Sequence, residues 1–221
     1  PRWLQFRAQD PDGFRDFMHG GREETSHFIL PMAAWRDDTV VFMGPRFSGF
    51  NVLKVDDLTA LEILSRKSIV ELLDYFRRRA PGFEDAWIML TAPQLGARHS
   101  RRLAGRDMMT GAGTKSGVIL PDEIGVSPSL SPNLPEVSVP YGALLPVKTD
   151  NLLVAGRHIS TDSQTHTFMR EIPQCWLTGH AAGAAAALSA NSGAAPRDLE
   201  INELQAALTK QGAFVRANET S

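Results

Sequence analysis

Apolar positions in the first half of the chain predict a small sheet followed by a long helix. Three runs rich in β-branched and aromatic residues indicate strands: HFILPM at 27–32, TVVFMG at 39–44 and NVLKV at 51–55. Beyond them, Asp56 and Asp57 suit the start of a helix, and large apolar residues then recur at helical spacing until Pro81. The pattern therefore predicts a helix over 57–80 beside a sheet.

The second half of the chain alternates short apolar runs with loop-forming and helical sequence. Residues 111–140 are rich in Gly, Pro and Ser, which indicates a loop-dominated passage between two structural units. The other expected elements are strands at Ala86–Leu90, Gly117–Leu120 and Asn151–Ala155, and helices at Pro173–Ala190 and Asp198–Gln211. Together these elements predict an α/β protein with α+β character in its first part.

Composition and charge exclude several classes of partner and site. The formal net charge of -2 offers no basic field to nucleic acid, and no polybasic run suits an anionic membrane. Cys175 is the single cysteine, so we expect neither an internal disulfide nor a metal site. The low-charge stretch 172–195 is rich in alanine and not in leucine, which favours a buried helix over a membrane span. The chain begins PRWLQF without a signal-peptide pattern, so we expect a cytoplasmic protein.

The stretch from 151 to 188 carries the strongest chemical signal. A strand that ends in Gly156 lets a ligand approach the backbone closely, because glycine has no Cβ. A helix that opens with Pro173 leaves the N–H groups of Gln174 and Cys175 directed outward, where an anion or an electron-rich carbonyl is favoured. Gly179 and Gly183 would allow the helix to pack closely on a sheet. An ordinary buried helix explains the same residues, and both interpretations stay open at this point.

Ordered blocks of sequence add a resemblance to a known family. In the C-terminal part they are VPYGALLP at 139–146, DNLLVAGRHIS at 150–160, Arg170, and IPQCWLTGHAAGAAAAL at 172–188. Upstream they are DDLTALE at 56–62, PGFEDAWI at 81–88 and LGARHSRRLAG at 95–105. The set, which covers about residues 50–190, resembles the FAD-dependent oxidoreductase family with the glutathione-reductase-type flavin fold.

The resemblance implies FAD as cofactor and the C-terminal part of a two-domain flavoprotein. It divides the chain into a substrate-domain portion at 1–112, a loop-rich connection at 113–150 and a C-terminal segment of the FAD-binding domain at 151–221. The G-x-G-x-x-G turn that holds the ADP half of FAD in this fold does not occur in the sequence. We therefore expect as partner an N-terminal FAD-binding polypeptide with the Gly-rich motif, either a second chain or a removed portion of the same one. A homo-oligomer of the assembled unit is left open.

The resemblance also implies which residues contact the cofactor. The backbone of Gly156 and Arg157 would face the ribityl and pyrophosphate side of FAD, and His158 would lie at the flavin. The helix start at Ile172, Gln174 and Cys175 would present N–H groups to the flavin ring. Plainer alternatives remain for three of these residues: a surface ion pair for Arg157, an ordinary hydrogen bond for His158, and a small buried side chain for Cys175. The helix start is expected to lower the pKa of the Cys175 thiol.

Two residues are candidates for catalysis. His166 lies in the predicted loop that faces the flavin edge, where it could act as a base or orient the substrate. It does not stand at the family's histidine position, which Ser163 occupies here, so no role is transferred to it. Arg98 shares one face with Ser100 and Arg102 if the segment is a strand, and it could meet an anionic substrate or the flavin. A structural role for this basic cluster, joining the two domains, is the favoured alternative.

These features predict part of a flavoenzyme, as a subunit or processed chain, that oxidises a small organic substrate by hydride transfer to FAD. The chain would supply the substrate pocket and the flavin-ring side of the FAD site. An uncharged or partly apolar substrate is suggested by aromatic residues in the first part, namely Phe28, Trp35, Phe42, Phe47 and Phe50. The alternative is a non-catalytic assembly or regulatory subunit that retains a flavoprotein fold.

Overall fold

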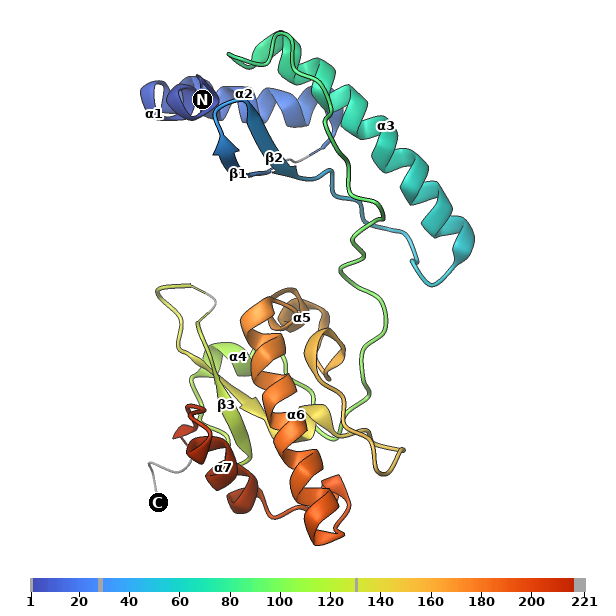
Figure 1. The fold of residues 1–221 in the computed structure, drawn as a ribbon, viewed down its shortest axis with the longest axis vertical. Helices are drawn as coiled ribbons and strands as arrows, with labels where there is room; N and C mark the ends of the chain where they lie inside the picture. Colours follow the sequence, from blue (N-terminus) through green and yellow to red (C-terminus); the bar gives the residue numbers. More distant parts are fainter. Residues whose placement is uncertain (1, 28–29, 130, 217–221) are drawn as a thin grey trace. The chain divides into compact units, whose positions relative to one another are not determined.

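The chain forms two compact units, residues 1–100 and 101–221. A computed structural model describes residues 2–27, 30–129 and 131–216, and Figure 1 shows the elements of each unit. Mixed helix and small antiparallel sheets agree with the expected α/β class. The assignment of the two units to substrate and FAD-binding domains stays a prediction.

The first unit contains a helical pair, a hairpin and one long helix. Its elements are α1 (Arg2–Gln9), α2 (Pro11–Thr25), β1 (Leu30–Arg36), β2 (Thr39–Met43) and α3 (Val55–Arg79). The helix predicted at 57–80 is confirmed as α3, with acidic residues in its first turn and three arginines in its last. The strand predicted at 51–55 is wrong. The Asp57 carboxylate accepts the N–H of Asn51 at 2.7 Å, which turns the backbone back onto the start of α3.

An aromatic cluster forms the core of the first unit. Phe17 of α2 stacks on Tyr75 of α3 with 5.2 Å between ring centroids, and the Tyr75 hydroxyl donates to the Phe17 carbonyl at 2.6 Å. Phe76 packs edge-on against Phe17 at 5.1 Å and against Phe42 of β2 at 4.9 Å. Such contacts add about 0.5–1.5 kcal/mol per pair beyond simple burial. They join α2, α3 and the hairpin into one body.

Two other predictions concern the first unit: a strand after α3 and aromatic residues near a substrate. The strand predicted at Ala86–Leu90 is wrong, because these residues join no sheet among the described part of the chain. Of the aromatic residues expected near a substrate, Phe28 and the side chain of Trp35 lie outside the described residues. Phe42 is partly buried and packs against the core of the first unit, and its role near a substrate stays a prediction.

The second unit is built around one long helix. Its elements are α4 (Gly113–Ser116), β3 (Glu123–Ser127), β4 (Val137–Pro140), η1 (Tyr141–Leu144), η2 (Gly156–His158), α5 (Ser163–Met169), α6 (Ile172–Ser192), η3 (Pro196–Asp198) and α7 (Ile201–Lys210). β3 and β4 pair antiparallel, α6 packs against β3 and η2, and α7 packs against α6 and β3. The two helices predicted at 173–190 and 198–211 are confirmed as α6 and α7.

Two strands predicted in the second unit are wrong. Residues 117–120 contain no strand, since Gly117 ends α4 in the left-handed region at φ +70°. Residues 151–155 contain no strand either, and a single bond from the Val154 N–H to the Leu144 carbonyl at 2.9 Å is the main-chain contact recorded for them. An apolar run becomes a strand only where a neighbouring backbone can complete the ladder.

Three backbone segments, 103–109, 141–147 and 154–161, are joined by hydrogen bonds. The Leu103 N–H donates to the His158 carbonyl at 2.7 Å, and the Ser160 N–H donates to the Ala143 carbonyl at 3.0 Å. Gly105 permits this approach, because a Cβ there would lie 2.6 Å from the Ser160 Cβ. Residues 101–112, which the sequence grouped with the first part, consequently lie in the second unit.

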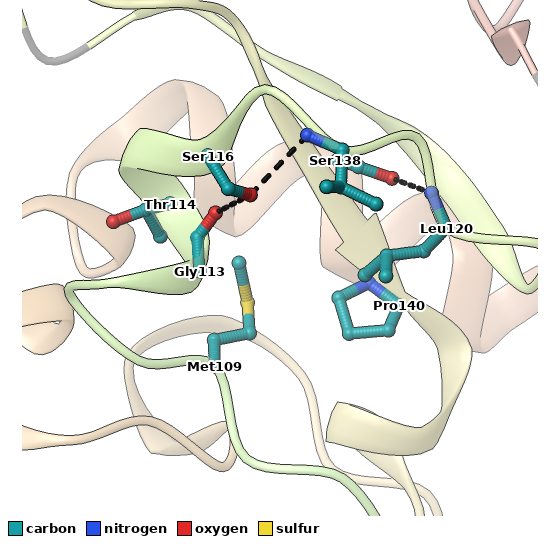
Figure 2. A pocket seen from close by; sticks show the side chains of 8 residues that line it. Met109, Gly113, Thr114, Ser116, Leu120, Ser138 and Pro140 are labelled. Carbon is teal, nitrogen blue, oxygen red and sulfur yellow. Dashed lines mark hydrogen bonds between the residues drawn. The ribbon is translucent and has the colours of Figure 1, made fainter.

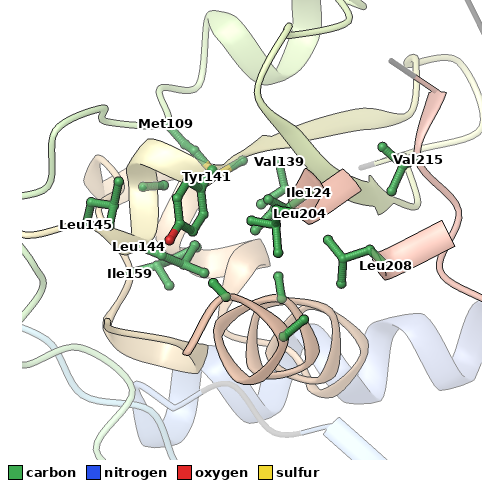
Figure 3. Packing of buried hydrophobic residues seen from close by; sticks show 14 of the residues in the cluster. Met109, Ile124, Val139, Tyr141, Leu144, Leu145, Ile159, Leu204, Leu208 and Val215 are labelled. Carbon is green, nitrogen blue, oxygen red and sulfur yellow. The ribbon is translucent and has the colours of Figure 1, made fainter. Parts of the chain in front are cut away.

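The core of the second unit lies between the sheet, α6 and α7. Figure 3 shows its side chains converging from several elements: Ile124 and Val139 from the sheet, Leu204 and Leu208 from α7, Leu144 from η1, and Ile159 directly after η2. Tyr141 belongs to the same core and donates its hydroxyl to the Pro196 carbonyl at 2.8 Å. Burial raises the pKa of Tyr141 to about 12, with Arg106 acting in the opposite direction. The neutral phenol is therefore the form that the core holds.

A buried carboxylate ties the end of the described chain to this core. The Glu123 side chain on β3 is 0% exposed. It accepts the Arg216 N–H at 2.6 Å and the Arg216 Nη2 at 2.8 Å. The second acidic partner of Arg216 is Glu136, which is 3.8 Å away and 57% exposed. Glu123 therefore depends on Arg216 for its charge balance.

We predict that Arg216→Ala destabilises the second unit by about 3–5 kcal/mol, because it leaves a buried carboxylate without its cation. Urea unfolding followed by circular dichroism measures the change. Glu136→Ala is the matched control, since it removes only an exposed partner of the same arginine and should cost less than about 1 kcal/mol. Equal effects of the two substitutions would contradict the role given to Glu123.

Candidate functional site

The turn at Gly156–His158 is fixed to α6 by a single buried hydroxyl. Gly156 has φ +73°, a left-handed conformation that favours glycine, and its N–H donates to the Thr178 Oγ1 at 2.9 Å. Thr178 is 0% exposed, and its own proton is donated within α6 to the Gln174 carbonyl at 2.9 Å. One hydroxyl thus accepts from the turn and donates to the helix. This hydroxyl therefore fixes the position of the Gly156 backbone against α6.

Cys175 lies directly against Gly156. A Cβ built on Gly156 would stand 3.7 Å from the Cys175 sulfur, which is ordinary van der Waals contact. The Cys175 thiol donates to the Arg170 carbonyl at 3.4 Å. Burial raises the pKa of Cys175, and this effect and that of Glu171 exceed the opposing effect of Arg157. The expectation of a lowered thiol pKa is therefore wrong, because desolvation outweighs the helix start.

The first turn of α6 offers two amide donors. Pro173 has no N–H, and the Cys175 N–H is already engaged with the Glu171 carbonyl at 3.0 Å. No bond to another described residue is recorded for the N–H groups of Ile172 and Gln174, and no side chain caps the helix. This turn was expected to present the N–H groups of Ile172, Gln174 and Cys175. In the structure the N–H groups of Ile172 and Gln174 can serve as such donors, whereas the N–H of Cys175 is already bonded.

Gln174 adds a buried acceptor at the same helical turn. Its side chain is 5% exposed, and its Nε2 donates to the Ser127 Oγ at 3.0 Å. Its Oε1 has no hydrogen-bond partner among the described residues. A buried polar atom without a partner is uncommon in folded proteins and calls for an explanation. The start of α6 therefore combines outward N–H donors with one unsatisfied carbonyl oxygen.

His166 also supports the turn. It lies in helix α5 and not in a loop as predicted, and it is 2% exposed. Its Nε2 lies 3.1 Å from the Arg157 carbonyl, and since a carbonyl can only accept, Nε2 carries the proton. His166 therefore holds the backbone of Arg157, while the Arg157 and His158 side chains are exposed.

Asp162 fixes the start of α5 and was not identified from the sequence. Its carboxylate accepts the Thr165 N–H at 2.7 Å and the Gly111 N–H at 2.8 Å. Burial raises the pKa of Asp162, but these hydrogen bonds outweigh burial and keep the pKa below its ordinary value. An acidic residue three positions before Thr165 is the N-cap signal that would have revealed α5. Thr178 was also missed, because a lone threonine in an alanine-rich helix carries no distinctive pattern.

The basic segment 98–102 is not a strand, so its side chains do not alternate as expected. Arg98 lies in the first unit, where its Nη2 donates to the Met43 sulfur at 2.9 Å. Arg102 lies in the second unit and donates its Nη1 to the Thr161 carbonyl at 3.1 Å. This bond lies within the second unit, so the role favoured for this cluster, joining the two domains, stays a prediction. The catalytic role of Arg98 stays a prediction.

The small residues of α6 do not face the sheet as predicted. Nothing lies within 4 Å of a Cβ built on Gly179 or Gly183. The helix packs instead through the face that carries Thr178 and the buried alanines, which are Ala181, Ala184 and Ala185. Ile172 and Trp176 share the open side and are 63% and 73% exposed. The face of α6 that carries the glycines is thus uncovered among the described residues.

Two cavities in the described part of the chain are smaller than a typical ligand pocket. Figure 2 shows one of about 80 Å³ beside α4 and β4, lined by Met109 and by the hydroxyl-bearing Ser116 and Ser138. The other, about 200 Å³, lies between β3, α6 and residues 213–214. Pockets for organic ligands span about 300–1,000 Å³. Within the described ranges no group of three His, Cys, Asp or Glu could hold a metal ion, and no helix is long and apolar enough to cross a membrane.

We predict that Cys175 reacts slowly with iodoacetamide near neutral pH, because a raised pKa leaves little thiolate. The midpoint of its pH–rate profile should lie at higher pH in the folded chain than in the chain unfolded by urea. Glu171→Gln should move the midpoint down and Arg157→Gln should move it up, since these charges act in opposite directions on the thiol. A midpoint below that of the unfolded chain would contradict this assignment.

Comparison with known proteins identifies one family. The family model described as FAD dependent oxidoreductase matches residues 16–129 and 130–208. No curated protein and no solved structure matches the chain. The match covers most of both units and includes η2, α5 and α6. The chain therefore belongs to the FAD-dependent oxidoreductase family, whose cofactor is FAD.

Proposed function

We propose that the chain is part of a flavoenzyme that oxidises a small organic substrate, and that its second unit holds the flavin-ring side of FAD. The observation that carries the proposal is the Gly156 turn, fixed by Thr178 beside the uncapped start of α6. Bound FAD would supply the acceptor for a hydride from a substrate carbon. The residues of this chain would bind and orient the cofactor.

The donor set at the start of α6 fits the flavin ring. An isoalloxazine edge carries both carbonyl oxygens and an N–H group. The N–H groups of Ile172 and Gln174 suit the oxygens, whereas the Gln174 Oε1 is buried and is not presented to the ring. Helix α6 has 21 residues, and the positive end of its dipole lies at this start. It would favour negative charge on the ring.

Around this turn the other residues have positioning roles. Gly156 leaves the backbone accessible, and the exposed Arg157 and His158 lie where they can reach a bound cofactor. His166 would keep the Arg157 carbonyl in place through its Nε2 proton, and with its ring 2% exposed it orients the turn and does not act as a base. For Arg98 the proposed role is contact with the substrate.

The remaining half of the FAD site is assigned to a partner polypeptide that carries a Gly-rich dinucleotide motif. The 221 residues contain no G-x-G-x-x-G sequence, which supports this assignment. The uncovered face of α6, with Ile172, Trp176, Gly179 and Gly183, gives further support, since exposed apolar residues in one area mark interaction sites. The small cavities in the described part of the chain favour the alternative of a non-catalytic subunit.

The two functions are separated by purifying the tagged chain with the polypeptide that accompanies it and recording the visible spectrum. We expect flavin bands that bleach when a substrate of the enzyme is added under anaerobic conditions. The chain expressed by itself should retain no stoichiometric FAD. A stable complex without flavin would favour the non-catalytic subunit, and tight FAD in the isolated chain would contradict the need for a partner.

We predict that Gly156→Val lowers the FAD content of the assembled protein at least about tenfold, a loss of about 1.4 kcal/mol in binding free energy. A β-branched residue is strained at φ +73°, and its side chain would block the backbone. Gly193→Val is the matched control, since Gly193 ends the same helix at φ +75° with nothing within 4 Å. The backbone strain of this variant is similar, but Gly193 lies at the far end of α6 from the proposed site. The FAD content of the variant should therefore stay normal. Equal losses in both variants would refer the effect to stability and not to the site.

A further inference from the structure

Residues 87–90 form an apolar stretch whose backbone has no partner. No hydrogen bond joins their N–H or C=O groups to any other described residue. Their side chains are also exposed: 70% for Trp87, 37% for Ile88, 68% for Met89 and 86% for Leu90. Four consecutive large apolar residues are rarely left open in a folded protein.

Helix α3 holds both ends of this stretch. The Arg77 Nε donates to the Ala86 carbonyl at 2.7 Å, and the Arg66 Nη2 donates to the Ala92 carbonyl at 2.9 Å. Farther along, the Glu62 carboxylate accepts the Leu95 N–H at 2.6 Å. Figure 1 shows the chain after α3 running back along the helix. The flanks are therefore fixed by polar contacts, and the apolar middle is not.

The spacing of the two arginines agrees with an extended backbone between their acceptors. Arg66 and Arg77 lie eleven residues apart on α3, which corresponds to about 16 Å at 1.5 Å per residue. The six residue-to-residue steps from Ala86 to Ala92 would span about 20 Å if extended, and only about 9 Å if helical. The extended length is closer than the helical length to the separation of the two arginines along α3. Residues 87–90 thus have the length of an extended strand but no hydrogen-bonded neighbouring strand among the described residues.

An extended backbone with unpaired N–H and C=O groups is the edge of an incomplete sheet. Native proteins protect such edges with charges, prolines or a covering element. No charged residue and no proline occurs between Ala86 and Ala92, and Trp87 and Ile88 have high strand propensity. The chemistry of this edge therefore selects one kind of occupant, which is another β-strand.

We propose that residues 87–90 accept a β-strand from the partner polypeptide that completes the flavin site; this inference rests on the proposed function. Pairing would satisfy the backbone groups and cover the exposed side chains. A second copy of this chain is a weaker occupant, because a contact of four residues per copy buries roughly a few hundred Å², whereas stable dimers bury about 1,200–2,000 Å². A partner that is also held at the FAD site needs no such area at this edge.

Hydrogen exchange followed by mass spectrometry tests the pairing. The amides of residues 87–90 should exchange rapidly in the isolated chain and at least about a hundredfold more slowly in the complex purified with the tagged chain. The amides of α3 serve as reference, since they should be protected in both samples. Absence of protection in a complex that contains flavin would overturn the strand pairing and leave the proposed function intact. Protection in a complex without flavin would support the pairing and contradict the proposed function.

Other patterns of protection exclude other occupants. Protection in the isolated chain that rises with its concentration would identify a second copy and overturn the proposal. Protection that is independent of concentration would identify pairing within the chain and overturn it equally. Rapid exchange in a chain that purifies without any partner would contradict both the pairing and the proposed function.

A pair of substitutions at one position separates backbone from side-chain effects. Ile88→Pro removes one N–H and should weaken association with the partner at least about tenfold. Ile88→Ala keeps the N–H and removes only a side chain that is 37% exposed, so it should weaken association less. The reverse order would show that the backbone is not paired. Circular dichroism confirms that both variants retain α3.

Discussion

The hydrogen bond from the Gly156 N–H to the Thr178 hydroxyl is the contact on which the site depends. It joins a left-handed turn to the second turn of a long helix, and its acceptor, the Thr178 hydroxyl, belongs to a side chain that is 0% exposed. A buried donor left without its acceptor would cost about 1–3 kcal/mol. The turn, the start of α6 and the Cys175 thiol between them therefore keep a common geometry. His166 secures the other end of the same turn through the Arg157 carbonyl.

The helices were predictable from the sequence because their signals are local. The signals are acidic residues in the first turn of α3, Pro81-Gly82 after it and Pro173 at the start of α6, and all act within a few residues of the helix ends. The strands were not equally predictable. Runs at 51–55, 86–90 and 151–155 have strand composition, yet a strand exists only when a second backbone lies beside it. Propensity without a neighbour leaves an extended or turning segment.

The candidate site also combines features with local sequence signals and features that depend on distant segments, and only the first kind was predicted. Gly156 and the start of α6 could be identified from the resemblance and from the chemistry of helix ends. The raised pKa of Cys175 could not, because it follows from burial, which depends on the packing of distant segments. Nor could the open side of Gly179 and Gly183 be foreseen. Small residues allow close packing on a helix face without showing which face is packed.

The two units differ in how their surfaces are completed. Each has its own core, aromatic in the first unit and largely aliphatic in the second, so each can fold around its own apolar residues. Yet each also leaves apolar residues uncovered, at 87–90 in one and along α6 in the other. Residues 87–90 lack backbone hydrogen bonds, whereas beyond its first turn α6 forms them within the helix. The first surface therefore requires a strand, whereas the second accepts any apolar surface that fits against glycine.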